Sequence, residues 1–194
     1  MSEKSRAEPY PENDIEIIEL GDSTSQFIRN FECDVGEIKK FLVEDALNQS
    51  REGVNRTFLW MSRETHQLLG YITICVDSIH LDKFQRDEEA KRGLPYKALP
   101  ALKIARMGVQ REFCRKGIGT KMISFAVKKA LDINRIAACR FITLDAKSDV
   151  PENLKPIRFY KKNDFKELKY KKKEKSVPMF KDLVDIIKAE QKRI

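Results

Sequence analysis

The apolar residues between positions 118 and 131 recur with the spacing of an α-helix. Lysines occupy one face of this segment, and the other face carries Ile123, Ala126, Val127, Ala130 and Leu131. An apolar run over residues 101–109 precedes the segment, and a second run over residues 141–144 follows it. This order predicts a strand, a helix and a second, parallel strand joined by a right-handed crossover.

The rest of the chain is patterned as shorter elements. Apolar runs predict strands over residues 15–20, 57–62 and 68–76. An amphipathic pattern predicts a helix over residues 37–49, and a helix-like pattern follows residue 183. We interpret the charged residues 80–99 as a solvated surface loop, with a lid over a substrate as the alternative.

These patterns suggest one main domain with two short ends. At 194 residues the chain is long enough for a substantial core. We expect a flexible N-terminal segment at residues 1–13, a domain at residues 14–183 and a C-terminal helical extension at residues 184–194.

Residues 107–122 join the predicted strand to the predicted helix through a turn that contains Gly117 and Gly119. Glycines let neighbouring backbone N–H groups converge, and the start of a helix adds unpaired donors and a positive dipole end. The turn is therefore a candidate anion cradle for phosphate. The spacing excludes a P-loop, and a dinucleotide fingerprint would need a small residue in place of Met122. An ordinary tight turn is the alternative.

The net charge of the chain also favours an anionic ligand. There are 38 basic and 30 acidic side chains, so the formal net charge is +8, which favours polyanionic partners. Much of the excess lies in a lysine block that comprises Lys161, Lys162, Lys166, Lys169, Lys171, Lys172, Lys173 and Lys175. A block of charge near a functional site carries more weight than net charge alone.

Other features narrow the class of protein. The four cysteines lack the paired spacing of a zinc site or a disulfide framework, and we expect buried thiols. His66 and His80 are too isolated for a metal site, so no metal is expected. Without a run of eighteen apolar residues or a signal-peptide core, the chain is predicted to be cytoplasmic and to have no membrane contact.

Two motifs resemble those of the GNAT N-acetyltransferase superfamily. Residues 114–119 are similar to its motif A, Arg/Gln-x-x-Gly-x-Gly/Ala, with Cys114 in the first position. Residues 158–165 resemble its motif B, Phe-Tyr-x-x-x-Gly-Phe, with Asp164 in place of a glycine that takes a left-handed backbone at the end of a helix. The resemblance implies an α/β fold with a mixed, centrally splayed sheet of six to seven strands flanked by helices.

The same resemblance implies acetyl-CoA as the cofactor and assigns roles to residues. The cofactor-binding residues would be Met107, Gly108, Val109, Cys114, Arg115, Lys116, Gly117, Ile118, Gly119 and Thr120. The N–H near Val109 would polarise the thioester carbonyl, and Tyr160 would protonate the leaving thiolate. The alternative for Tyr160 is an aromatic packed on the sheet. Glu112 or a water is the candidate general base.

The N-terminal half is similar to the GNAT toxins of bacterial toxin–antitoxin pairs. The similarity is carried by residues 31–34, 37–46, 53–58, 69–73, 105–109 and 145–147. It covers residues 15–183 and ends in residues 177–183, which resemble the final strand of the family. Those toxins acetylate the α-amine of aminoacyl-tRNA, which implies that acceptor here. The tRNA phosphates would contact Lys161, Lys162, Lys169, Lys171, Lys172 and Lys173.

Two alternatives to this function stay open from the sequence. A plain GNAT enzyme would acetylate a small amine or a protein amine. A basic RNA-binding module with a degenerate cofactor pocket would have no catalytic activity. The expected partners are acetyl-CoA, charged tRNA, an antitoxin protein and a second copy of the chain in a homodimer.

Overall fold

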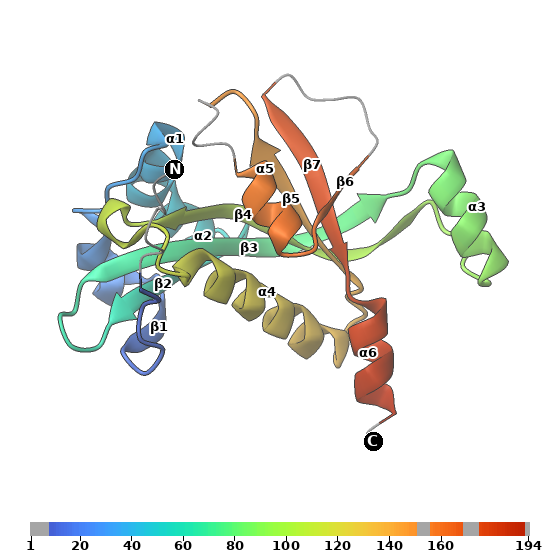
Figure 1. The fold of residues 1–194 in the computed structure, drawn as a ribbon, viewed down its shortest axis with the longest axis horizontal. Helices are drawn as coiled ribbons and strands as arrows, with labels where there is room; N and C mark the ends of the chain where they lie inside the picture. Colours follow the sequence, from blue (N-terminus) through green and yellow to red (C-terminus); the bar gives the residue numbers. More distant parts are fainter. Residues whose placement is uncertain (1–7, 151–155, 169–174, 193–194) are drawn as a thin grey trace, which may run out of the picture. The chain divides into compact units, whose positions relative to one another are not determined.

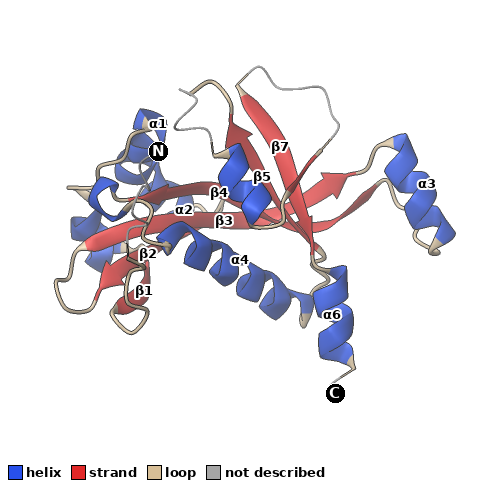
Figure 2. Cartoon of the chain, in the orientation of Figure 1, coloured by secondary structure: helices blue, strands red, loops and turns tan. Residues whose placement is uncertain are grey.

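Seven strands pair into one sheet, in the order β1-β2-β3-β4-β5-β7-β6, in a computed structural model of the chain (Figures 1 and 2). The structure describes residues 8–150, 156–168 and 175–192. The strands are β1 (Ile15–Glu19), β2 (Arg56–Ser62), β3 (Leu68–His80), β4 (Ala98–Val109), β5 (Phe141–Lys147), β6 (Lys166–Glu167) and β7 (Ser176–Asp182). β4 and β5 pair in parallel, whereas β5 and β6 each pair antiparallel with β7. The predicted mixed α/β sheet, with its parallel pair, is confirmed.

Helices surround this sheet, and most of them match the sequence pattern. They are η1 (Asp22–Ile28), α1 (Gly36–Lys40), η2 (Phe41–Asp45), α2 (Ala46–Arg51), α3 (Lys83–Lys91), η3 (Arg111–Phe113), α4 (Ile118–Asn134), α5 (Ile157–Lys162) and α6 (Val184–Gln191). The predicted helix over residues 37–49 is the continuous stretch formed by α1, η2 and α2. The helix after the glycine turn is α4, and the helix-like C-terminal pattern is α6.

The chain divides into two compact units. The first comprises Met1–Cys75 and Ala105–Ser124, and the second comprises Val76–Ile104 and Phe125–Ile194. β3, β4 and α4 each run from one unit into the other. The domain boundaries expected from the sequence stay predictions.

The core of the first unit is built by β2, β3 and the helical stretch 36–51. Leu42, Leu59 and Tyr71 are fully buried in it. The Tyr71 ring packs edge-on against Phe31 with 5.4 Å between ring centres, and its hydroxyl donates to the carbonyl of Ile38 at 2.7 Å. Burial raises the pKa of Tyr71 strongly, so this hydrogen bond persists at every physiological pH.

The core of the second unit lies around the first residues of β5. Leu81, Leu99 and Phe141 are buried together, and Phe180 of β7 packs edge-on against Phe141. The parallel pairing within this unit joins Ala101–Ile104 of β4 to Phe141–Leu144 of β5.

The prediction of a surface loop over residues 80–99 is wrong, because α3 lies within it (Figure 1). α3 is highly charged and has no apolar stripe of helical period, so the sequence carried no signal for it. Glu89 of α3 is buried instead, with its carboxylate accepting hydrogen bonds from both terminal nitrogens of Arg140 at 2.7 and 2.9 Å. Arg140 also donates to Asp182 at 2.7 and 3.0 Å. This ion triad of Glu89, Arg140 and Asp182 fixes α3 in place of an apolar face.

The expectation of buried thiols is wrong for three of the four cysteines. All four are free, and Cys139 is buried, whereas Cys33 and Cys75 are half-buried and Cys114 is exposed. Cys114 lies in the surface loop between η3 and α4, where local sequence does not report burial. Among the residues that the structure describes, no helix is both long and apolar enough to cross a membrane.

Candidate active site

The predicted anion cradle is the short loop between η3 and α4. Arg115 and Gly117 both have left-handed backbones, with φ of 66° and 82°. Such left-handed residues turn successive N–H groups toward one side of a loop and create a concavity that binds anions. The sequence pointed to Gly117 and Gly119, but Gly119 lies in the first turn of α4. The second left-handed residue is therefore Arg115.

The first turn of α4 adds further donors to the cradle. A helix leaves its first N–H groups without intrahelical acceptors, and here the Lys121 amide bonds back to the carbonyl of Gly117 at 3.2 Å. The amides of Ile118, Gly119 and Thr120 precede that bond and stay outside the helical ladder. α4 has no acidic residue in its first turn, so its own carboxylates do not neutralise the positive end of its dipole.

Gly117 leaves open space beside these donors. A Cβ atom at this position would have no atom of another residue within 4 Å except those of its chain neighbours. Its backbone is nevertheless in the left-handed region, which is costly for any residue with a side chain. A side chain at position 117 would therefore be strained and would project into the space that an anion needs.

Gly108 is tightly packed in β4, the strand that leads to the cradle. A Cβ atom on it would lie 2.7 Å from Ile38 Cγ2 and 3.0 Å from Tyr71 Cε1. Met107 and Val109, the residues on either side of Gly108, are half-buried and lie on the opposite face of β4. Core packing explains the glycine, and a part for these three residues in cofactor binding stays a prediction.

We expect Gly108→Ala to lower the free energy of unfolding by about 1–3 kcal/mol, because the added methyl group overpacks the core of the first unit. Urea unfolding followed by circular dichroism measures this change. Gly36→Ala is the matched control, since a Cβ atom there meets nothing within 4 Å. Equal stability of wild type and Gly108→Ala would contradict the packing argument.

The N-terminal segment braces the cradle loop. The amide of Tyr10 donates to the carbonyl of Lys116 at 2.9 Å, and the Tyr10 ring packs edge-on against Phe113. Glu12 forms an ion pair with Lys121 at 3.3 Å. The sequence carries no signal for Tyr10 or Glu12, because these contacts join segments far apart in the chain and leave no local pattern.

Cys114 and Glu112 sit at the edge of the same loop. The Cys114 sulfur lies 3.8 Å from the carbonyl oxygen of Gln110, and partial desolvation raises the pKa of this thiol. Cys114 is therefore protonated at neutral pH. Glu112 is exposed and lines a polar cleft of about 450 Å³ together with Glu32 and Gln110. Its role as a general base stays a prediction.

Tyr160 lies in the second unit, on α5. It is buried, and its ring packs edge-on against Phe159 and Phe165, with ring centres 5.2 and 5.7 Å apart. Burial raises the pKa of Tyr160 to about 12. The hydroxyl is therefore protonated at neutral pH and able to donate a hydrogen bond, although it is a weaker acid than a solvated phenol.

The left-handed backbone predicted at the end of the Tyr160 helix is confirmed, since Asp164 has a φ of 65°. Lys181 of β7 caps this end. Its ammonium group donates to the carbonyl of Asn163 at 3.0 Å and to the carboxylate of Asp164 at 2.9 Å. A cation at a helix C-terminus also meets the negative end of the dipole. Lys181 of β7 thus holds the end of the helix that carries Tyr160.

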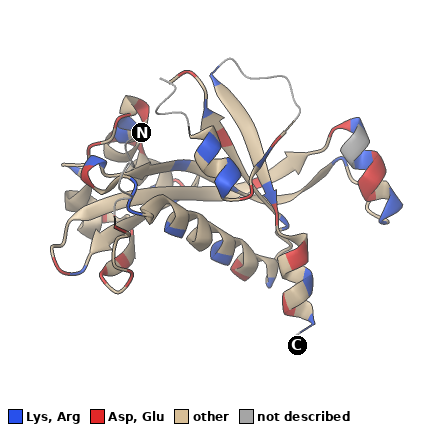
Figure 3. Ribbon diagram, viewed as in Figure 1, with Lys and Arg blue, Asp and Glu red and all other residues tan. Residues whose placement is uncertain are grey.

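The structure describes only part of the lysine block. Lys161 is paired with Glu167 at 2.7 Å, while Lys162, Lys166 and Lys175 are exposed. The remaining members, Lys169, Lys171, Lys172 and Lys173, lie outside the described residues. Basic side chains are also spaced along α4 (Figure 3). Contact between the block and tRNA phosphates stays a prediction.

We expect Tyr160 to contribute no tyrosinate signal below pH 10. The pKa of about 12 in the folded state is above the unfolded value of about 10. The stability gained from burying the neutral phenol is therefore complete below pH 10 and is lost as the pH rises toward 12. Difference absorbance titration of wild type against Tyr160→Phe measures this. A Tyr160-dependent midpoint near 10 would show that the hydroxyl is solvated.

Comparison with known proteins gives both a family match and structural neighbours. A family model for the acetyltransferase (GNAT) domain matches residues 55–167. No curated protein sequence matches the chain. A tyrosine-to-phenylalanine variant of KacT shares the fold with a TM-score of 0.74 and 19% identity, over 91% of this chain and 99% of that one.

Two structures of the toxin AtaT share the fold as well. A variant bound to acetyl-CoA and the C-terminus of the antitoxin AtaR has a TM-score of 0.70 and 19% identity, over 89% of this chain and 96% of that one. AtaT complexed with acetyl-methionyl-tRNAfMet has a TM-score of 0.72 and 20% identity, over 89% of this chain and 97% of that one. Because the matching family model spans more than half of the sequence and includes both the cradle and Tyr160, the chain belongs to the GNAT acetyltransferases, enzymes whose acetyl donor is acetyl-CoA.

Proposed function

We propose that this enzyme transfers the acetyl group of acetyl-CoA to the α-amine of aminoacyl-tRNA. The observation that supports acetyl-CoA as the donor is the cradle of backbone amides at residues 115–120, within the matched GNAT domain. Aminoacyl-tRNA as the acceptor is supported by the fold shared with AtaT, which was solved with acetyl-methionyl-tRNAfMet, and by the net charge of +8.

The cradle fits the pyrophosphate of acetyl-CoA. Anionic oxygens need several convergent N–H donors, and the amides at the start of α4 are free to donate to them. The absence of a side chain at Gly117 lets the oxygens approach the backbone closely. The position of Cys114 is compatible with this role, because that position acts through its backbone amide.

The reacting end requires two further groups from this chain. Acetyl-CoA supplies the thioester and its leaving thiolate. As the amine attacks, negative charge develops on the carbonyl oxygen, and we assign its stabilisation to a backbone N–H near Val109. We assign to Tyr160 the hydrogen bond to the departing sulfur. Because its pKa exceeds the value of about 8.5 for a free thiol, the bond stabilises the sulfur as it leaves as a thiolate, without complete proton transfer. The proton of the attacking amine passes to a general base, for which Glu112 or a water is the candidate.

The acceptor has a rival within the same chemistry. Acetylation of a small amine or a protein amine would use the same donor site and the same tyrosine. A non-catalytic RNA-binding module is set aside, because the chain belongs to an acetyltransferase family. An antitoxin partner is part of the proposal, because AtaT was solved bound to the C-terminus of the antitoxin AtaR. A cytoplasmic location is part of it as well, because charged tRNA is a cytoplasmic substrate. The homodimer stays a prediction from the sequence.

Radiolabelled acetyl-CoA tests the acceptor directly. Wild-type enzyme is incubated separately with charged tRNA, deacylated tRNA, polyamines and lysine-containing peptides, and acid-precipitable or chromatographed product is counted. We expect label in charged tRNA alone and its release by mild base, which hydrolyses the aminoacyl ester. Label in peptides or polyamines, with none in charged tRNA, would replace the proposed acceptor.

A further inference from the structure

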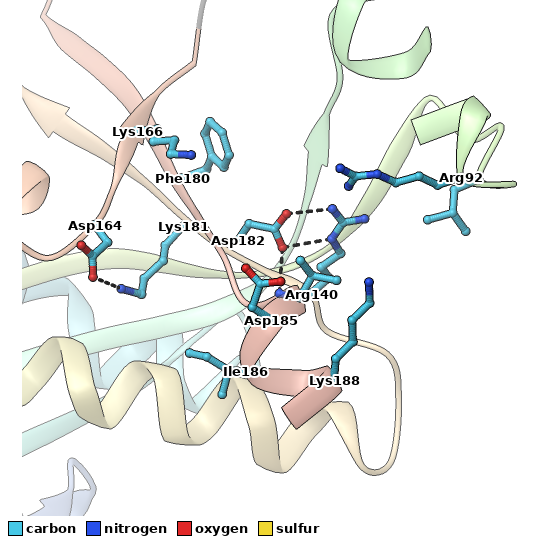
Figure 4. Close-up of a pocket in the computed structure, with 12 residues that line it drawn as sticks. Arg92, Arg140, Asp164, Lys166, Phe180, Lys181, Asp182, Asp185, Ile186 and Lys188 are labelled. Carbon is cyan, nitrogen blue, oxygen red and sulfur yellow. Dashed lines mark hydrogen bonds and ion pairs between the residues drawn. The ribbon is translucent and has the colours of Figure 1, made fainter. Parts of the chain in front are cut away.

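A cleft of about 790 Å³ opens in the second unit, and the acetyl-transfer chemistry does not use it (Figure 4). Its walls come from β6, β7, α6 and the segment that follows α3. Its cationic lining residues are Arg92, Arg140, Lys166, Lys181 and Lys188, against three aspartates. We call this cleft the basic groove.

The cations of the basic groove are only partly neutralised from within. Arg92 and Arg140 share one carboxylate oxygen of Glu89, at 3.1 and 2.9 Å. Among the residues that the structure describes, Lys166 and Lys188 form no ion pair. Figure 4 shows Arg92, Arg140 and Lys188 directed toward the same space. Arg140 is already paired with Glu89 and Asp182, and Lys181 is already paired with Asp164. The positive charge available to a guest therefore lies mainly on Arg92, Lys166 and Lys188, and it favours an anion.

The basic groove is larger and less polar than a site for one inorganic anion. Phe180, Leu94 and Ile186 also line it, and Ile186 is 38% exposed. Figure 4 shows Lys166 beside the Phe180 ring. A groove that combines cations with an aromatic face is the arrangement that binds single-stranded nucleic acid, because the cations meet phosphates and the ring stacks on a base.

We propose that the basic groove binds single-stranded RNA next to the reacting 3′ end of the acceptor. This inference rests on the proposed function. It is supported by the position of Lys181, which lines the groove and also caps the helix that carries Tyr160. RNA seated in the groove therefore runs past the end of α5, and Arg92, Lys166 and Lys188 contact its phosphates. An acidic peptide is the rival occupant.

The test compares two variants of equal charge in the full-length protein. The groove variant is Arg92→Gln with Lys166→Gln and Lys188→Gln. The control variant is Arg29→Gln with Lys40→Gln and Lys128→Gln, three exposed cations outside the groove. Fluorescence anisotropy measures binding of a labelled single-stranded RNA that ends in CCA, of deacylated tRNA and of an oligoglutamate peptide, over a range of salt concentrations. Calorimetry with acetyl-CoA checks that both variants keep the cofactor site.

We expect the groove variant to bind both RNAs at least 10-fold more weakly than wild type. The slope of log affinity against log salt should fall by about 0.7 for each phosphate of the single strand that the variant no longer neutralises. The control variant should change RNA affinity less than threefold, and acetyl-CoA affinity should be unchanged in both. Equal weakening of RNA binding by both variants would show an effect of net charge alone and would overturn the inference that RNA binds in the groove.

The remaining outcomes separate this inference from the proposed function. If wild type acetylates charged tRNA while the groove variant binds RNA normally, the inference that the groove binds RNA is overturned and the proposed acceptor is supported. If RNA binding depends on the groove but wild type acetylates only peptides, the inference about the groove is supported and the proposed acceptor is overturned. Groove-dependent binding of oligoglutamate, with groove-independent binding of RNA, would assign the site to an acidic peptide and overturn the proposal.

Discussion

Gly117→Asp is expected to abolish measurable binding of acetyl-CoA. The substitution places a carboxylate in the open space beside the cradle amides, and it forces a side chain onto a left-handed backbone. Loss of two charge-assisted hydrogen bonds, at about 1.5–3 kcal/mol each, weakens binding by about 100-fold or more. Isothermal titration calorimetry measures the affinity, and thermal unfolding reports the stability of the variant.

Gly53→Asp separates backbone strain from loss of the anion site. Gly53 lies in the same unit, has a φ of 71° and also has open space around its missing side chain. Both variants should therefore lose similar stability, while only Gly117→Asp loses acetyl-CoA. If a folded Gly117→Asp protein binds acetyl-CoA with wild-type affinity, the pyrophosphate does not occupy the cradle.

Tyr160→Phe is expected to lower kcat by about 10²- to 10⁴-fold, the usual contribution to the rate of a side chain that stabilises the leaving group. The ring and its contacts with Phe159 and Phe165 are kept, so acetyl-CoA affinity and melting temperature should hardly change. Single-turnover acetylation of charged tRNA measures the chemical step. A fall in turnover with unchanged affinity is the signature of an interaction made in the transition state.

Tyr71→Phe is the matched control for this experiment. Tyr71 is also buried, but its hydroxyl donates to a backbone carbonyl in the core of the first unit. Its removal should cost about 1 kcal/mol of stability and leave the rate per folded molecule unchanged. If Tyr160→Phe behaves in the same way, the Tyr160 hydroxyl is structural, and the site has another means of stabilising the thiolate.

Local pattern was enough to predict the elements around the cradle. The helical period predicts a buried face, and Ile123, Ala126 and Ala130 of that face are indeed buried, whereas Val127 and Leu131 are half-buried. The glycine turn reports a backbone conformation that few other residues adopt, which is why Gly117 could be identified. The aspartate at position 164 was a departure from the motif, yet its left-handed backbone was predicted correctly, because that conformation belongs to the helix end.

Contacts between distant segments could not be predicted in this way. α3 is held by Glu89 against Arg140, and neither residue carries a local signal for the other. The bracing of the cradle by Tyr10 has the same cause. Arg115 was expected to bind through its position in the motif, but its left-handed backbone is unusual for a residue with a side chain, and no sequence rule identifies it.

The way in which α3 is attached allows residues 82–96 to be replaced as one segment. The amide of Leu81 donates to the carbonyl of Lys97 at 3.1 Å, so the residues on either side of this segment are already hydrogen-bonded to each other. A short turn can therefore replace the whole segment without stretching β3 or β4. Arg140 would lose Glu89 but keep Asp182, so no buried charge would be left alone. The replacement also removes Arg92 and Leu94, so it takes away one wall of the basic groove together with α3.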